Sequence, residues 1–488
     1  MTPLRVLAVA SEIYPIIKTG GLADVVGALP IALRAYGIET RTLVPGYPDV
    51  LKVLPAAEVL LHWPHFHGGP VRLLSGSHEN LDLLVLDAPH LFARPGNPYV
   101  TPDGKDWPDN GVRFAALSRM AAEIGLGAIP AFVPDIVHAH DWQAGLAAAY
   151  LHYANGPRPG TVMTVHNLAY QGKFPHDMLD TFGLPPQSFT IHGVEYYGMI
   201  SFLKAGLQFA DRITTVSPTY AIEIQGDEEG MGLGGLLRER SRVLSGILNG
   251  IDISVWNPET DPHIAARFSA KEPQSRTANK AALQRRLGLD PSADGLLLGV
   301  ISRLSWQKGL DLLLENAPTI LNEGMQLALL GSGDQDLQDR YQAVAKANMG
   351  RIAVLIGYDE ALAHLIQAGA DALVVPSRFE PCGLTQLCAL RYGAVPIVSG
   401  VGGLSDTVVD VEEADMAGGA ATGFKFAPVT SENLAGALRK ASNAFHDKHA
   451  WRRLQHNGMS TDVSWRNRAS QYAALYQEVA GARRNQAH

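Results

Sequence analysis

Short runs of branched apolar residues alternate along this chain with longer segments that have helical periodicity. Runs too short to be helices and rich in Val, Leu and Ile predict buried strands of a parallel sheet. The alternation of such strands with helices predicts an α/β fold in which helices cover both faces of each sheet. The predicted strands cover 5–10, 40–44, 81–86, 136–139 and 161–165, and then 296–301, 327–330, 353–356, 372–375 and 395–398.

The pattern is interrupted once, by a polar stretch at 258–280, before apolar strands begin again. A chain of 488 residues is too long for a single core, so we expect a boundary between two domains near Asn249. The predicted domains are 1–248 and 249–464. From Trp465 onward, apolar residues recur at alternating spacings of four and three, which predicts one apolar helix face packed against the first domain.

Composition narrows the class of protein and of partner. The chain is 46% hydrophobic and 18% charged, with a net charge of −8 and no basic run, which argues against nucleic acid or an anionic membrane as partner. No apolar run approaches the ~20 residues that span a bilayer, and Glu12 interrupts the N-terminal run, so we expect a first strand there rather than a signal peptide. The two cysteines, Cys382 and Cys388, lie on one predicted helix and point in different directions, which favours a reducing, cytoplasmic setting.

The first candidate site follows the predicted strand 372–375. Arg378 and Glu380 come directly after this strand, and a helix can begin at Gly383 and end at Gly393. Ligands collect at the carboxyl ends of strands in open α/β sheets, and a helix N-terminus favours an anion. A carboxylate beside an anion seat suggests a ligand with both hydroxyls and phosphates, such as a sugar nucleotide. An ordinary strand–helix turn is the alternative.

Two further turns carry cations. Arg303 and Lys308 lie between the strand 296–301 and the next helix, where two cations would form an anion clamp, unless they are solvated surface charges. In the first domain, Gly20 and Gly21 follow the first strand and precede a helix, with Lys18 just ahead of them. Such a turn lets backbone N–H groups approach a diphosphate closely, although plain architecture explains it equally.

Histidines at two strand ends suggest either ligand contact or a metal site. His166 lies at the carboxyl end of 161–165, where we expect it to face a ligand. His138 and His140 share one face of a strand, as metal ligands would. No further cluster of ligands accompanies them, so no metal is predicted. Instead, Asp141 is predicted to cap a helix that begins at Trp142, and it is a possible sugar contact.

Three other features have ordinary alternatives. Trp107 lies in a loop-like segment, 101–114, and would either stack on a sugar or simply pack. Residues 230–235 satisfy G-x-G-x-x-G, but polar and acidic residues precede them where a dinucleotide site needs a strand, so a loop is predicted. Asp334 and Asp336 imitate the D-x-D of metal-using sugar transferases, at a spacing too common to carry weight.

Taken together, the motifs resemble those of the ADP-glucose-using glycosyltransferase family five, the bacterial glycogen synthases and plant starch synthases. The motifs that carry the resemblance, in the family's order, are KTGGLADV, HAHDWQ, TVHN, NGID, ISRLSWQKG, SRFEPCGLTQL and GGLSDTV. The resemblance implies two Rossmann-like domains facing each other across a cleft (GT-B type), with the C-terminal helix, 465–488, crossing back to the first. It also implies transfer of α-D-glucosyl from ADP-glucose to the non-reducing 4-hydroxyl of an α-1,4-glucan, with retention of configuration. We expect no metal or other cofactor, because Arg303 and Lys308 supply the charge that a divalent ion supplies elsewhere.

The resemblance further implies roles for single residues. Lys18 would contact the donor, Arg303 and Lys308 the departing diphosphate, Glu380 the hydroxyls of the donor sugar, and His166 would lie beside the reacting glucose. The first domain would serve the acceptor and the second the nucleotide sugar. Further donor-side residues implied in this way are Gly20, Gly21, Asn249, Tyr358, Cys382, Gly383, Leu384 and Thr385.

The chain departs from the wider group of retaining transferases at one position. Their second glutamate lies eight positions after the first, but here that position is Cys388, so Glu380 alone can carry a carboxylate role. Other readings remain open from the residues: UDP-glucose as donor, a metal hydrolase built on His138, His140 and Asp141, a dinucleotide oxidoreductase built on 230–235, and a non-catalytic glucan-binding protein.

Overall fold

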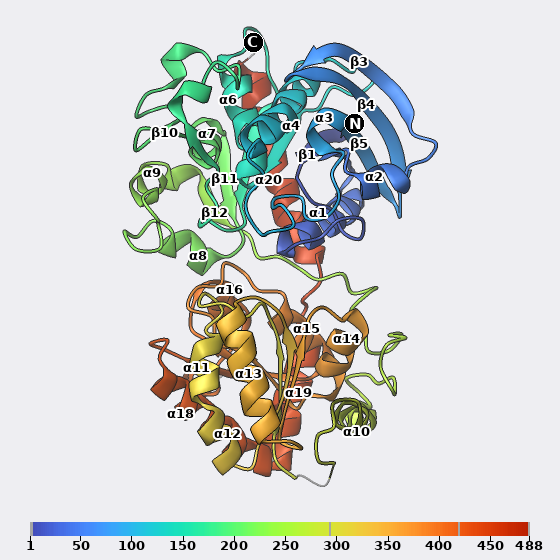
Figure 1. The fold of residues 1–488 in the computed structure, drawn as a ribbon, viewed down its shortest axis with the longest axis vertical. Coiled ribbons are helices and arrows are strands. Elements are labelled where there is room, and N and C mark those ends of the chain that lie inside the picture. Colours follow the sequence, from blue (N-terminus) through green and yellow to red (C-terminus); the bar gives the residue numbers. More distant parts are fainter. Residues whose placement is uncertain (1–2, 292–293, 418–419, 487–488) are drawn as a thin grey trace. The chain divides into compact units, whose positions relative to one another are not determined.

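The computed structural model describes residues 3–291, 294–417 and 420–486. The chain forms two compact units: unit 1 is Met1–Asn249 with Trp465–His488, and unit 2 is Gly250–Ser464. Each is an α/β layer structure, as the alternating pattern predicts, and every predicted strand is present. Figure 1 shows the strands of both units with helices around them.

Unit 1 contains, within the described residues, a nine-stranded sheet in the order β12-β11-β7-β6-β1-β2-β5-β4-β3. The parallel strands spread outward from β1 in chain order, with β2 and β5 on one side and β6, β7, β11 and β12 on the other. The strands are β1 (Leu4–Val9), β2 (Ile38–Pro45), β3 (Glu58–Phe66), β4 (Gly69–His78), β5 (Leu81–Asp87), β6 (Ile136–His140), β7 (Gly160–Val165), β11 (Arg212–Thr215) and β12 (Leu244–Gly246).

The antiparallel hairpin β3–β4 was not predicted, so this sheet is mixed rather than wholly parallel. The outer strand β3 is largely exposed or half-buried along its length, and its pairing with β4 shifts register between Val59 and Leu61 and between Trp63 and Phe66. An exposed, irregular edge strand has no clean alternation of apolar and polar positions, which is why the pattern did not reveal it.

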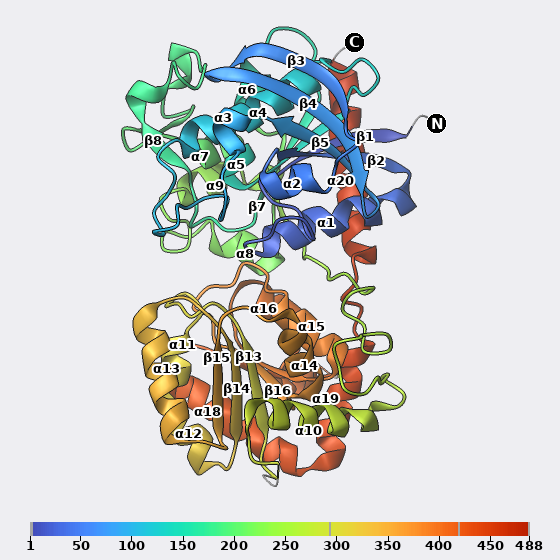
Figure 2. The ribbon, with the colours of Figure 1, turned by 45° about the vertical axis from the view of Figure 1, so that its right-hand side comes forward.

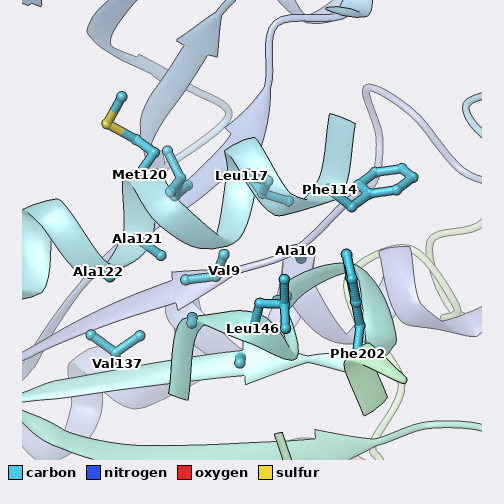
Figure 3. Packing of buried hydrophobic residues seen from close by; sticks show 14 of the residues in the cluster. Val9, Ala10, Phe114, Leu117, Met120, Ala121, Ala122, Val137, Leu146 and Phe202 are labelled. Carbon is cyan, nitrogen blue, oxygen red and sulfur yellow. The ribbon is translucent and has the colours of Figure 1, made fainter. Parts of the chain in front are cut away.

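The core of unit 1 forms where α4 packs over the sheet. Phe114, Leu117 and Met120 of α4 lie above Val9 of β1, and all four are fully buried (Figure 3). A separate small sheet contains β8 (Lys173–Pro175), β10 (Met199–Ser201) and β9 (Glu195–Tyr196). The helices of unit 1 are α1 (Gly21–Leu33), α2 (Pro48–Lys52), α3 (Pro89–Phe92), α4 (Asn110–Gly125), α5 (Asp141–Ala144), α6 (Leu146–Tyr153), α7 (Phe202–Phe209), α8 (Pro218–Glu223), α9 (Gly234–Glu239) and α20 (Arg466–Gln486).

The C-terminal helix α20 belongs to unit 1, as its apolar periodicity predicted. It contacts α1, β6 and β7 and is drawn in red beside the strands (Figure 1). The predicted apolar face is buried in a cluster with Val25 and Leu29 of α1. Arg483 adds an ion pair with Asp211. The members of the buried face are Trp465, Ala469, Tyr472, Tyr476 and Val479.

Unit 2 contains, within its described part, a six-stranded parallel sheet in the order β15-β14-β13-β16-β17-β18. In chain order this is 3-2-1-4-5-6, the strand order of the Rossmann fold. The same order describes the first six parallel strands of unit 1. The strands are β13 (Leu297–Ile301), β14 (Gln326–Gly331), β15 (Ile352–Ile356), β16 (Ala372–Val375), β17 (Val395–Ser399) and β18 (Phe424–Phe426).

Helices cover both faces of this sheet (Figure 2). Helices α11, α12, α13 and α18 contribute to the larger cluster on one face, and α10 and α14 to the cluster on the other. The helices of unit 2 are α10 (Arg276–Leu287), α11 (Leu310–Glu315), α12 (Ala317–Asn322), α13 (Gln335–Ala347), α14 (Glu360–Gly369), α15 (Thr385–Tyr392), α16 (Gly402–Thr407), α17 (Val411–Ala417), α18 (Ser431–His446) and α19 (Lys448–Ser460). None of the helices in the described ranges is long and apolar enough to cross a membrane.

Candidate functional site

Each sheet has one place where the strand order reverses, and most of the candidate residues lie there. The reversal falls between β1 and β6 in unit 1 and between β13 and β16 in unit 2. The loops after the two strands diverge at such a point and leave room for a ligand at their carboxyl ends. Lys18 follows β1 and Asp141 follows β6, whereas Lys308 follows β13 and Glu380 follows β16.

In unit 2 the structure brings Lys308 and Glu380 into direct contact. Lys308 Nζ donates to Glu380 Oε2 at 2.6 Å, and the two side chains are 18% and 9% exposed. Ser377 Oγ donates to the same carboxylate oxygen at 2.8 Å. Such donors offset the cost of burying a carboxylate with so little solvent contact. The cation predicted for a phosphate and the carboxylate predicted for a sugar are therefore one charge-paired unit.

Backbone contacts hold the loop that carries Glu380. Gly403 N, in the first turn of α16, donates to Glu380 O at 3.0 Å. A Cβ at Gly403 would lie 2.4 Å from Cys382 Cα, so only glycine permits this approach. The GGLSD motif thus has a structural role: it fixes the peptide that positions the carboxylate.

Arg378 has a structural role in the same region, because its guanidinium is already paired within unit 2. Its guanidinium donates to both carboxylate oxygens of Asp311, at 2.7 and 2.6 Å, and to Trp306 O at 2.6 Å. The Arg378 hydrogen bond holds the pKa of the Asp311 carboxyl below its usual value. The guanidinium also lies 4.6 Å from the centre of the Trp306 ring. These contacts tie the loop after β16 to the loop after β13.

Arg303 and Tyr358 lie at the surface of unit 2. Arg303 is exposed, and no other residue in the described ranges forms an ion pair with it. Tyr358 follows β15, is 78% exposed, and donates its hydroxyl to Glu360. Both side chains are therefore accessible to a ligand at the carboxyl edge of the sheet.

The remaining donor-side candidates form the entry to α15. This helix starts at Thr385, two residues after the predicted start at Gly383, and ends before Gly393 as predicted. Gly383 has a φ of +73°, which glycine adopts without strain. Cys382 is buried, whereas Leu384 and Thr385 are half-buried. Asn249, the last residue of the first segment of unit 1, is buried, and its Oδ1 has no hydrogen-bond partner in the part of the chain that the structure describes.

In unit 1, Glu12 organises the glycine-rich loop, a role that the sequence pattern did not reveal. Glu12 is 3% exposed. Its carboxylate accepts hydrogen bonds from Thr19 N, from Thr19 Oγ1 at 2.6 Å, from Gly20 N at 3.3 Å and from Tyr99 Oη. The sequence did contain a signal for this role: Glu12 is a single acid between an apolar strand and the K-T-G-G loop. A buried acid must be paired, so hydrogen-bond donors from that loop could have been expected.

The space at Gly20 is open. Its backbone is extended, with φ −156° and ψ −168°, and an added Cβ would meet no atom within 4 Å. Neither backbone strain nor packing in the described chain therefore requires glycine here. No side chain caps α1, which begins at Gly21, and Lys18 Nζ pairs with Asp24 Oδ1 at 2.8 Å.

His138 and His140 take part in hydrogen bonds within the described part of unit 1. His138 bonds Tyr476 Oη at 2.7 Å and Thr164 Oγ1 at 2.6 Å, and His140 Nδ1 lies 2.9 Å from His166 Nε2. Burial lowers the pKa of His138 to about 3. No group of three or more potential metal ligands occurs within 3–291, 294–417 and 420–486. These histidines are neutral members of a hydrogen-bonded network that reaches α20.

Asp141 does not cap the helix at Trp142; that prediction is wrong. Its φ is +56°, and Oδ1 accepts a hydrogen bond from His166 N at 2.7 Å instead. Burial raises the pKa of the Asp141 carboxyl to about 7, although hydrogen bonds from the backbone of His166 and Asn167 oppose this. Burial also lowers the pKa of His166 to about 3. The structure thus holds the two candidates together, with His166 as a neutral imidazole.

The other sequence features have structural explanations. Trp107 is half-buried, its indole N–H donates to Asn97 O at 3.3 Å, and Arg94 lies 4.8 Å from its ring centre. In the described chain no strand lies directly before 230–235; turns follow α8 and lead into α9 at Gly234. Asp334 caps α13 by accepting from Leu337 N at 3.0 Å.

Comparison with known proteins agrees with this architecture. Residues 289–454, most of unit 2, match the group 1 glycosyl transferases, so the chain falls in the class of glycosyltransferases with two Rossmann-like units. Residues 5–239, most of unit 1, match the starch synthase catalytic domain. Together with a full-length relative that is 73% identical, described next, this match shows that the chain belongs to the starch and glycogen synthase family.

Full-length relatives support the assignment. The chain is 73% identical over 484 residues to glycogen synthase 2 of Bradyrhizobium diazoefficiens, covering 99% of this chain and 100% of that one. It is 64% identical to a glycogen synthase of Rhodopseudomonas palustris, with 99% of both chains covered. A solved structure, the catalytic domain of starch synthase IV from Arabidopsis thaliana bound to ADP and acarbose, has 34% identity and a TM-score of 0.88 over 98% of this chain and 100% of that chain.

Proposed function

We propose that this chain transfers α-D-glucosyl groups from ADP-glucose to the non-reducing 4-hydroxyl of an α-1,4-glucan, with retention of configuration. The observation that carries the proposal is the Lys308–Glu380 pair, 2.6 Å apart at the strand reversal of unit 2, with the exposed Arg303 on the same loop. The related starch synthase was solved with ADP and acarbose, which supports a nucleotide sugar as donor and a glucan as acceptor.

The proposed chemistry follows from charge. As the glycosidic bond to ADP breaks, negative charge develops on the diphosphate and positive charge on the sugar ring. Arg303 and Lys308 would stabilise the diphosphate. Removing one such preorganised contact typically raises the activation free energy by ~3 kcal/mol. Glu380 would accept hydrogen bonds from the donor sugar's hydroxyls while keeping Lys308 in place. Because two cations supply the charge, the reaction needs no divalent ion.

Other residues have supporting roles in the proposal. Unit 2 would carry the nucleotide sugar, with Tyr358, Cys382, Gly383, Leu384 and Thr385 on its nucleotide side. Unit 1, completed by 465–488, would carry the acceptor and contribute donor contacts through Lys18, Gly20, Gly21 and Asn249. A neutral His166, held by His140 and by Asp141, would hydrogen-bond a glucosyl hydroxyl. Trp107 is not needed in this scheme.

The setting proposed is cytoplasmic. Cys382 and Cys388 are both buried and form no disulfide in the described part of the chain, which is in keeping with a reducing compartment. Because residue 388 is a cysteine, that position provides no second carboxylate beside Glu380. The proposal therefore does not include a covalent double displacement through a glutamate at that position.

The test is product analysis. Purified protein with glycogen and ADP-glucose labelled in the glucosyl group should give labelled glucan that β-amylase degrades to labelled maltose, because the new linkages are α-1,4. Lys308→Ala is the matched control and should incorporate label about 10²–10³-fold more slowly. Label that stays in free glucose, or in a product resistant to β-amylase, would refute the proposed transfer.

A further inference from the structure

A buried ionic cluster in unit 2 is centred on His364 of α14, which is 2% exposed. Its Nδ1 lies 2.7 Å from Asp261 Oδ2 and its Nε2 lies 3.6 Å from Glu360 Oε1. Tyr392 of α15 donates its hydroxyl to the same Asp261 oxygen at 2.6 Å. The Trp256 ring stacks on the imidazole at 4.0 Å with an interplanar angle of 6°. The imidazole is therefore held on its ring face and at both nitrogens.

The surroundings favour the imidazolium form. Burial alone would lower the pKa of His364, but the hydrogen bonds and charges of Asp261 and Glu360 outweigh burial and raise the pKa to about 9. The other titratable groups that face it are the Tyr392 hydroxyl and His263, whose ring centre is 5.0 Å away. At neutral pH the cluster thus contains one cation between two carboxylates.

Glu360 links this cluster to the surface. One of its carboxylate oxygens, Oε1, faces His364, and the other, Oε2, accepts the hydroxyl hydrogen of Tyr358. Tyr358 lies just after Gly357, whose φ is +134°, and is 78% exposed. An exposed tyrosine ordinarily samples several rotamers, and fixing it when a ligand binds costs conformational entropy. A hydroxyl anchored to a charged carboxylate has lost part of that freedom before the ligand arrives.

We propose that Glu360 and His364 are positioning residues that hold Tyr358 in the orientation in which its ring contacts the nucleotide of the donor. This inference rests on the proposed function, in which Tyr358 lies on the nucleotide side. Glu360 acts directly on the phenol, and His364 acts by fixing the Glu360 carboxylate. Neither residue touches substrate, so their loss should change donor affinity rather than the chemical step.

The test is a double-mutant cycle on the surface pair. Tyr358→Phe keeps the ring but removes the hydroxyl, and Glu360→Gln keeps the shape but removes the charge that roughly doubles the strength of the hydrogen bond. Each variant should raise KM for ADP-glucose about 3–10-fold with little change in kcat. The double variant should be no worse than Tyr358→Phe alone, because both changes break one contact.

The matched control is Glu123→Gln, which breaks an i,i+4 ion pair with Arg119 in unit 1. It should leave KM for ADP-glucose unchanged. Unchanged KM in Tyr358→Phe and Glu360→Gln, or effects that multiply in the double variant, would overturn the inference.

The pH dependence gives a readout that a purely structural role would not change. As pH rises through about 9, His364 loses its proton and its hold on Glu360, so KM of the wild type should rise there. The same rise should be absent in Tyr358→Phe, whose phenyl ring no longer depends on Glu360. A parallel rise in both proteins would overturn the role of His364.

Tyr358→Ala separates this inference from the proposed function. If Tyr358→Ala raises KM for ADP-glucose while Tyr358→Phe and Glu360→Gln do not, the ring contacts the donor but the positioning role is wrong. If Tyr358→Ala leaves KM unchanged in a protein that still transfers glucose, the assignment of Tyr358 to the nucleotide side is wrong and the positioning role fails with it. If the wild type transfers no glucose, the proposed function itself fails.

Discussion

The Lys308–Glu380 pair should have separable roles in stability and in turnover. Both side chains are shielded from solvent, at 18% and 9% exposed, and the charged atoms are 2.6 Å apart. Lys308→Met removes the cation and leaves Glu380 as a buried charge, with Ser377 as its remaining side-chain donor among the described residues. Removing one partner of such a pair typically costs about 3–5 kcal/mol. For a unit of this size, the lower figure corresponds to a fall in Tm of about 6–12 °C.

The double variant Lys308→Met/Glu380→Gln should recover most of that loss, because no unpaired buried charge remains. Turnover should behave differently. We expect Lys308→Met and the double variant to lose about 10²–10³ in kcat, because the cation that stabilises the departing diphosphate is missing from both. Thermal melts followed by circular dichroism and the initial rate of ADP release, measured on the same preparations, give both quantities.

Two results would refute this reasoning. A Lys308→Met protein that melts with the wild type would mean that the pair contributes nothing to the folded state. A double variant that regains both stability and turnover would mean that Lys308 serves only to neutralise Glu380 and does not act on the diphosphate.

Gly20→Ala should leave Tm unchanged, because its Cβ would enter open space, and should raise KM for ADP-glucose, because that space is where the donor is proposed to bind. Gly403→Ala should lower Tm, because its Cβ would lie 2.4 Å from the Cys382 backbone; equal Tm values for the two variants would contradict this. Cys388→Ala should lower Tm somewhat and leave kcat nearly intact, since the buried thiol packs rather than reacts; loss of kcat with an unchanged melt would disprove it. The folded pKa of His364, about 9, exceeds the unfolded value of 6.5, so its contribution to stability is complete below pH 6.5 and is lost as pH rises through 9; urea denaturation at pH 7 and pH 10, compared with His364→Gln, should show the fall in the wild type alone. Exhaustive chelation should leave activity unchanged; a loss restored by Mg²⁺ or Mn²⁺ would rule out the metal-independent scheme.

Ten of the parallel strands were predictable because a strand that is buried on both faces needs apolar side chains at every position. A short run of branched apolar residues such as 372–375 fits such a strand and is too short for a helix. The hairpin β3–β4 was not predicted because its outer strand, β3, is exposed and pairs irregularly with β4. The apolar helix face that starts at Trp465 was also predictable, because its period of 3.6 residues can be seen within one short segment of sequence. Three short parallel strands, β11, β12 and β18, were also not predicted, because three or four residues are too few to show a periodicity.

The candidate site was less predictable. Glu380 and Lys308 were identified separately from their places after strands, but a 72-residue separation hides the fact that they are paired with each other. The partner of His138 is Tyr476, 338 residues away, and only the folded sheet brings it near. Glu12 and Asp141 show the same limit, since their partners are backbone N–H groups, which every residue but proline carries and no motif distinguishes.

The central claim is that this chain transfers glucose from ADP-glucose to a glucan. The most direct measurement is the rate of nucleotide release in the presence of glycogen, with ADP-glucose and UDP-glucose supplied separately and glucosyl incorporation followed in parallel. We expect ADP to be released from ADP-glucose in one-to-one proportion to the glucose incorporated, and faster than UDP is released from UDP-glucose. Release of neither nucleotide, or release without incorporation into glycogen, would contradict it.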